Sequence, residues 1–444
     1  MKRLLFSTLT LCFFVTSGCD PLQSPQELID AGQLQDAVSL LEKIVQVKPE
    51  NVKARVLLSE VYDQLGQYNQ SVNQLREAIV ILPAQPKDQA VLRIKLAKLY
   101  LKNSDRKKAF SQLRLTLQST SDHDIISQVA GLITDRYQVT KLTEGDSDNY
   151  SPNFSSDGKQ IAFSSYRTDS SEVYLMDLNG RIRQRVTFTT DFNELAPVFL
   201  YDNKYILYIR EPKTSRQITI TLQGSGSSRI YAGLSISHIF SKKIQELLPI
   251  GHGVRAPSIS PDRKRILYEI KSGDNLELYE IDLTNVNFDN INPEAVSARQ
   301  ITKNATDDGS PAFYPDQKKI VFSSSRQEQP HQIYTTDING TNETHLNANP
   351  YDCYSPIVSP DGKQIVFVSA RYGDIEIYSM NVDGTNDHQI TNGIGASIQP
   401  AFSPDGSKIA FVSDRSDSFQ VYLIHLDQPI GKSECNTWLR ANKR

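Results

Sequence analysis

Apolar residues between positions 26 and 119 recur at steps of three and four, the spacing of one face of an α-helix. The pattern repeats after 34 and then 38 residues and aligns a turn residue, a small residue and a leucine in three units: Gly32, Gly66 and Ser104; Ala37, Ser71 and Ala109; Leu41, Leu75 and Leu113. The first part of the chain therefore predicts a solenoid of paired helices. A capping helix is expected at residues 121–137, with Ser121 or Asp122 as its N-cap.

The pattern then changes to short apolar–polar alternations, which are typical of β-strands. Six prolines mark six copies of one unit: Pro152, Pro197, Pro257, Pro311, Pro356 and Pro400. Each is followed by an aspartate after five residues, an isoleucine after nine and an aromatic residue after eleven. The aspartate predicts a tight turn, and the isoleucine and aromatic residue share one face of the next strand. With a third and a fourth strand, each unit makes one blade of a β-propeller.

The sixth unit lacks a fourth strand, whereas residues 139–143 precede the first unit and end in the Leu-Thr pattern of a fourth strand. Pairing the two would close the ring and protect two strand edges. The second unit departs from the pattern, with Thr219 in place of a tyrosine and a Gly/Ser-rich insertion at 223–228. We expect an N-terminal α-helical solenoid followed by a six-bladed all-β propeller.

Two resemblances follow from these repeats. The helical units resemble the tetratricopeptide repeat at Leu58, Tyr62, Gly66, Ser71, Ala78 and Pro83. The blades resemble the TolB-type propeller repeat, as in the segment 403–411, which reads Ser-Pro-Asp-Gly-Ser-Lys-Ile-Ala-Phe. The resemblance implies the propeller fold and a binding role in the cell envelope, without implying the partners of TolB.

The N-terminus resembles a bacterial lipoprotein signal: Lys2 and Arg3 precede an apolar stretch, and small residues lead to Cys19. The resemblance implies cleavage before Cys19 and lipidation of its thiol, which would anchor the protein to a membrane of the bacterial envelope, facing the periplasm or the exterior. An ordinary secretory signal is the alternative. The expected division is a signal at 1–19, helical repeats with their cap at 20–136, a propeller at 137–428 and a tail at 429–444.

The net charge of −3 offers no basic field for nucleic acid. After loss of the signal and lipidation of Cys19, Cys353 and Cys435 remain. They could form a disulfide in an oxidising compartment, although sequence does not show that they are close.

The sequence contains no Gly-x-Ser-x-Gly, no His-Glu-x-x-His and no phosphate-binding loop, so we expect no enzyme activity, metal or cofactor. Polar residues lie three and four positions before the marker prolines: Asp148, Asn149, Glu194, Asp307, Asp308 and Asp352. On loops entering the innermost strands they would form an acidic rim at one mouth of the channel, able to capture a cation or a basic peptide end. Ordinary solvated loop polarity is the alternative.

Together these features predict a scaffold that binds envelope or periplasmic proteins or peptides through both its helical repeats and its propeller. A sensor of a small ligand or cation, or an enzyme, would use the central channel instead. A spacer without a specific partner is a third possibility.

Overall fold

A computed structural model describes residues 23–442, apart from 83–85, 201–202, 214–231, 273–274, 327–329, 348 and 372, and without the side chains of residues 23 and 86. The predicted signal with Cys19, and Thr219 and the insertion of the second blade, lie outside these residues. The chain forms two compact units, Met1–Ile133 with Gly431–Arg444, and Thr134–Ile430.

The described part of the helical unit contains seven consecutive helices before the propeller: α2 (Gln23–Asp30), α3 (Leu34–Val47), α4 (Val52–Gln64), α5 (Tyr68–Ile81), α6 (Pro86–Lys102), α7 (Arg106–Ser119) and α8 (His123–Ile133). The aligned turn residues Gly32, Gly66 and Ser104 all have positive φ, near 60–71°, which ends one helix and starts the next. The aligned small residues are fully buried, so neighbouring helices approach closely there. The Asp122 carboxylate accepts a hydrogen bond from the N–H of Asp124 at 3.0 Å, as expected for the capping helix.

The C-terminal residues predicted as a tail form helix α9 (Lys432–Ala441), which belongs to the helical unit. Leu439 is fully buried, and the Trp438 ring packs edge-on against Phe110 of α7 at 5.4 Å. Arg114 of α7 also donates a hydrogen bond to the Leu439 carbonyl at 2.8 Å. The sequence did not predict that this segment packs in the helical unit. A short segment with one apolar face after a long β domain does not indicate which part of the chain it contacts.

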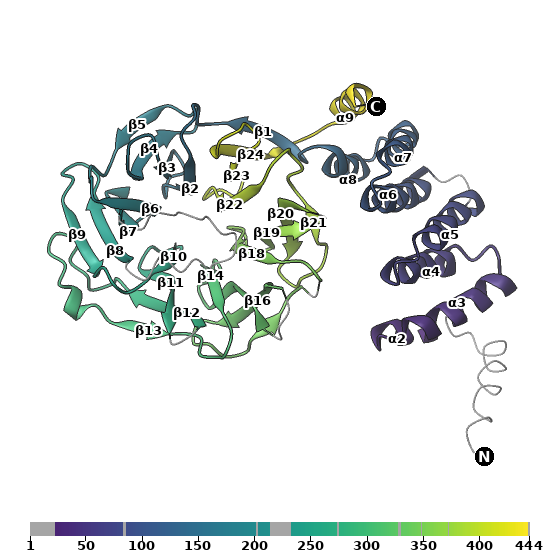
Figure 1. Cartoon of the computed structure of the whole chain (residues 1–444), viewed down its shortest axis with the longest axis horizontal. Helices are drawn as coiled ribbons and strands as arrows, with labels where there is room; N and C mark the ends of the chain where they lie inside the picture. The colour runs from purple at the N-terminus through teal and green to yellow at the C-terminus, as the bar shows by residue number, and fades with distance from the viewer. Residues whose placement is uncertain are drawn as a thin grey trace, which may run out of the picture. The chain divides into compact units, whose positions relative to one another are not determined.

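The propeller consists of six four-stranded antiparallel sheets arranged around a ring (Figure 1). The first three blades are β2 (Asn149–Phe154), β3 (Gln160–Ser165), β4 (Glu172–Asp177) and β5 (Ile182–Arg185); β6 (Phe192–Phe199), β7 (Tyr205–Pro212), β8 (Gly233–His238) and β9 (Ile244–Leu248); and β10 (Arg255–Ile259), β11 (Arg265–Ser272), β12 (Asn275–Asp282) and β13 (Ala298–Gln300).

The other blades are β14 (Asp308–Phe313), β15 (Lys319–Ser324), β16 (Gln332–Asp337) and β17 (Thr344–His345); β18 (Cys353–Val358), β19 (Gln364–Arg371), β20 (Asp374–Asn381) and β21 (His388–Gln389); and β22 (Ser397–Phe402), β23 (Lys408–Ser413) and β24 (Gln420–Pro429) with β1 (Tyr137–Lys141). Strand β1 pairs antiparallel with β24 and supplies the fourth strand of the sixth blade. The predicted closure is therefore confirmed, with β1 starting two residues earlier than expected.

The repeated isoleucine and aromatic residue of each second strand are almost fully buried and form the cores between blades. A recurrent β-bulge lies in each innermost strand, where the register shifts around the marker proline. The residue before each proline has a positive φ of 45–53° although none is glycine: Ser151, Ala196, Ala256, Ser310, Ser355 and Gln399. The proline thus marks the bulge of the innermost strand in every blade.

Candidate functional site: polar junctions between the blades

The residues predicted as an acidic rim lie in polar junctions between neighbouring blades. In four of the six blades, the side chain four positions before the proline accepts a hydrogen bond from a backbone N–H at the start of the third strand of the preceding blade. These pairs are Asp148 with Phe419 (3.0 Å), Asn193 with Ser171 (3.0 Å), Asp307 with Leu276 (2.8 Å) and Asp352 with His331 (2.9 Å). Each side chain therefore fastens one blade to the next.

Three positions before the proline, the residue is fully buried in all six blades: Asn149, Glu194, Val254, Asp308, Cys353 and Ser397. The structure thus corrects the predicted rim. Asn149, Glu194 and Asp308 do not face solvent at a channel mouth, and Asp148, Asp307 and Asp352 are half-buried and hydrogen-bonded to backbone. Solvated loop polarity does not describe these six residues either. Their polar atoms replace water at the blade contacts.

Sequence reasoning missed an arginine that recurs in these junctions. It lies 15 residues after the marker proline in four blades, as Arg167, Arg326, Arg371 and Arg415. Each guanidinium lies over the aromatic ring of the second strand and the tyrosine ring of the third strand, at 4.0–5.8 Å. Each Nε also donates to the serine two residues earlier, at 2.9–3.1 Å. A Ser-x-Arg triplet that ends 15 residues after the marker proline could have revealed this arginine in the sequence.

In three of these blades the far end of the arginine reaches the buried residue of its own blade. Arg167 donates to the Asn149 amide oxygen at 3.2 Å, and Arg326 donates to the Asp308 carboxylate at 3.0 Å. Arg415 donates to Ser397 at 3.2 Å and to Asp135 at 2.6 Å. Aromatic rings on one side and acceptors on the other hold each planar guanidinium in one orientation.

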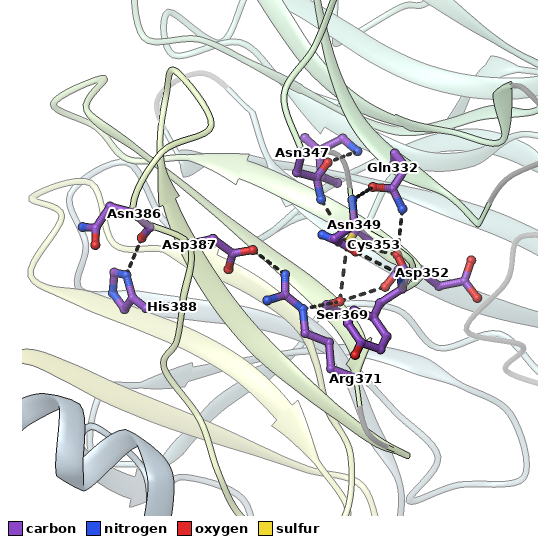
Figure 2. A network of polar contacts seen from close by, with 12 residues as sticks. Gln332, Asn347, Asn349, Asp352, Cys353, Ser369, Arg371, Asn386, Asp387 and His388 are labelled. Atoms are coloured by element: carbon purple, nitrogen blue, oxygen red, sulfur yellow. Dashed lines mark hydrogen bonds and ion pairs between the residues drawn. The ribbon is translucent and has the colours of Figure 1, made fainter. Parts of the chain in front are cut away.

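The junction between the fourth and fifth blades differs because it contains a thiol (Figure 2). Cys353 takes the position that Asp308 has in the preceding junction, and its Sγ lies 3.2 Å from the Asn347 amide and 3.3 Å from the Ser369 hydroxyl. Arg371 turns instead to Asp387, at 2.6 Å. Burial raises the pKa of the Cys353 thiol, so the reactive thiolate is disfavoured.

The possible disulfide between Cys353 and Cys435 is not formed in this structure. Both thiols are free and buried, Cys353 in the propeller and Cys435 in helix α9 of the helical unit. Burial also raises the pKa of Cys435, to about 11.

Buried carboxylates open the third strands of the first, third and fifth blades, as Glu172, Glu277 and Glu376. In the fifth blade, the Thr391 hydroxyl and the Gly393 N–H donate to Glu376 at 2.5 and 2.8 Å. Desolvation is the main cause that raises the pKa of Glu376 to about 7. At the junction of the first two blades, desolvation and then the nearby Glu172 charge raise the pKa of Glu194, also to about 7, despite the hydrogen bond from Thr189.

Glu194 and Glu376 could exchange protons near neutral pH, but each lies inside a blade contact. Among the residues that the structure describes, no three His, Cys, Asp or Glu side chains are grouped so that they could hold a metal ion. The junctions therefore serve first to fix neighbouring blades in one register.

Two family models match the chain. Residues 342–439, which include the fifth blade and three strands of the sixth, match the TolB beta propeller domain, and residues 28–90 match the tetratricopeptide repeat. The chain carries a TolB-type propeller and tetratricopeptide repeats. At the level of these families, the combination supports a protein-interaction scaffold with protein partners.

Several solved structures are similar to this chain. A protein of Agrobacterium tumefaciens assigned as TolB is 18% identical over 65% of this chain and 96% of its own, with a TM-score of 0.47. TolB from Acinetobacter baumannii is 17% identical over 71% of this chain and 70% of its own, with a TM-score of 0.45. An oligogalacturonate lyase from Vibrio parahaemolyticus is 13% identical over 66% and 95%, with a TM-score of 0.45. At such identities the likeness concerns the fold alone.

A comparison with curated proteins gives no significant match. Among the described residues, no helix combines the length and the apolar character that crossing a membrane requires.

Proposed function

We propose that the protein is a lipid-anchored scaffold of the bacterial cell envelope that holds envelope or periplasmic proteins through its two units. The observation that carries the proposal is the presence of a tetratricopeptide array and a TolB-type propeller in one chain. Each of these folds presents an extended surface on a rigid frame. The polar junctions and the paired strands β1 and β24 supply that rigidity in the propeller.

The anchor part of the proposal rests on the N-terminal sequence. Lys2, Arg3, the apolar stretch and Cys19 have the composition of a lipoprotein signal. Mass spectrometry of the mature N-terminus tests it directly. We expect a first residue Cys19 that carries a diacylglycerol thioether, and an unlipidated N-terminus at another residue would refute the anchor.

The scaffold part is tested by cross-linking in the native host. A photoreactive amino acid replaces either Lys95 of α6 or Lys363 of the fifth blade, which are surface residues of the two units. The control is an unrelated globular protein that carries residues 1–22 and the same photoreactive group. We expect a small set of envelope proteins that cross-link to the full chain and not to the control, and identical sets would refute a scaffold.

A further inference from the structure

The outer edge of the first two blades carries both exposed phenylalanines of the described chain. Phe188 lies in the loop after β5 and is 59% exposed, and Phe240 lies at the tip of the β8–β9 hairpin and is 73% exposed. Figure 1 shows β5, β8 and β9 as neighbouring elements of this part of the ring. Strand β5 and the β8–β9 hairpin touch, because the Gln184 amide donates to the Ile239 carbonyl at 2.5 Å and the Lys242 ammonium donates to the Arg185 carbonyl at 2.7 Å.

Two cations accompany the Phe188 ring. The Arg185 guanidinium lies 4.6 Å from the Phe188 ring centre, and the Lys242 ammonium lies 5.6 Å from it. Lys243 follows directly on the hairpin. We call this group of Arg185, Phe188, Phe240, Lys242 and Lys243 the Phe188–Phe240 patch.

The charges of this patch are only partly balanced. Arg185 pairs with the buried Glu172 at 2.8 Å. Within the described parts of the chain, neither the Lys242 nor the Lys243 ammonium has a carboxylate within 4.0 Å. Lys243 instead donates to the Asp289 carbonyl, while the Asp289 carboxylate accepts from the Tyr205 hydroxyl at 2.8 Å. The patch is therefore positive in a chain whose net charge is −3.

We propose that the Phe188–Phe240 patch binds the surface of an anionic lipid bilayer. Two protruding phenylalanine rings enter the boundary between headgroups and acyl chains without needing a matching pocket, and the neighbouring lysines meet lipid phosphates. An acidic protein segment would also match the charge, but it would have to cover two rings that stand on separate loops. The bilayer is the partner that fits both features at once.

The inference does not depend on the proposed anchor, and its test avoids the anchor. The cores of both units are built from residues after 22, so the chain can be prepared from residue 20 onward. Co-sedimentation with vesicles of phosphatidylglycerol and phosphatidylethanolamine is compared with co-sedimentation with phosphatidylcholine vesicles. We expect binding to the anionic vesicles only, and weaker binding at high salt because the lysine contribution is screened.

Two double variants separate the contribution of the phenylalanine rings to vesicle binding from that of the lysine charges. Phe188→Ala with Phe240→Ala should lower the partition coefficient by about tenfold or more, because each ring loses its apolar burial. Lys242→Gln with Lys243→Gln should lower it by about tenfold at low salt, since each lysine near an anionic surface contributes severalfold. Circular dichroism confirms that the variants fold, which their surface positions favour.

Matched controls remove similar side chains elsewhere on the propeller. Ile394→Ala removes an apolar side chain that is 88% exposed, and Lys159→Gln with Lys363→Gln removes two exposed lysines. These controls should bind vesicles as the unchanged protein does. The proposal is overturned if the unchanged protein ignores anionic vesicles, if the patch variants bind equally well, or if the controls lose as much. Binding to polyglutamate but not to vesicles would overturn it in favour of an acidic protein partner.

Discussion

The buried carboxyl group of Glu194 makes the stability of the propeller depend on pH near neutrality. Its pKa rises from the ordinary 4.5 to about 7 in the folded protein, chiefly because burial disfavours the charged form. A carboxyl group whose pKa is raised by folding contributes its stabilisation fully below the unfolded pKa and loses it as pH rises through the folded pKa. The propeller should therefore lose stability between about pH 4.5 and about pH 8.

The magnitude follows from the two pKa values. The difference between 4.5 and about 7 corresponds to about 3 kcal/mol of unfolding free energy. Glu376 has the same raised pKa and acts in the same direction. Aspartates with lowered pKa values, such as Asp405 at about 2, lose their stabilisation only in more acidic solution and do not offset this loss.

The perturbation is Glu194→Gln, which keeps the shape of the side chain and removes the titration. Urea unfolding near pH 5 and near pH 8, monitored by the circular dichroism of the β-sheet, measures the unfolding free energy of the propeller. The fluorescence of Trp438, the one tryptophan, reports the helical unit separately. We expect the unfolding free energy of the variant to fall by about 2.5 kcal/mol less than that of the unchanged protein between pH 5 and pH 8.

Glu144→Gln is the matched control, because the Glu144 side chain is 79% exposed. It should leave the pH dependence unchanged. The reasoning is refuted if Glu194→Gln keeps the full pH dependence, or if the unchanged propeller becomes more stable towards pH 8.

Three further predictions concern packing. Gly384→Ala should destabilise the propeller by several kcal/mol, since an added Cβ would lie 2.0 Å from the Leu346 carbonyl oxygen. Gly373→Ala has a similar φ but open space around the added Cβ, and it should cost only about 1–2 kcal/mol. Thermal unfolding of both variants checks this difference. Arg326→Met leaves Asp308 buried and unpaired and should cost about 3–5 kcal/mol by urea unfolding, and a cost below about 1 kcal/mol would contradict the junction model. In the chain from residue 20, the thiols of Cys353 and Cys435 should resist alkylation while the protein is folded and should react, without reductant, once it is unfolded. Rapid labelling of the folded protein would contradict their burial.

The sequence predicts the blades well because their repeats encode local physics. The aspartate turn, the buried isoleucine and the aromatic residue each depend on contacts within one blade. The closing strand could be predicted for a related reason, since an unpaired fourth-strand pattern and a missing fourth strand occur at the two ends of one repeat array.

The junctions could not be predicted in the same way. Whether Glu194 or Asp308 faces solvent depends on the neighbouring blade, which contributes the opposing strand across the contact. The polarity of these residues suggested an exposed rim. Residue type alone does not distinguish an exposed polar side chain from a buried one that is paired with an arginine. The α9 helix escaped prediction because its partners, Phe110 and Arg114, lie more than 300 residues earlier in the chain.

Cross-linking of the full chain in its native envelope tests the central claim most directly. With a photoreactive residue at position 95 or 363, a scaffold predicts specific envelope proteins that are attached from each unit and are absent from the anchored control protein. Cross-links indistinguishable from those of the control at both positions would contradict the account.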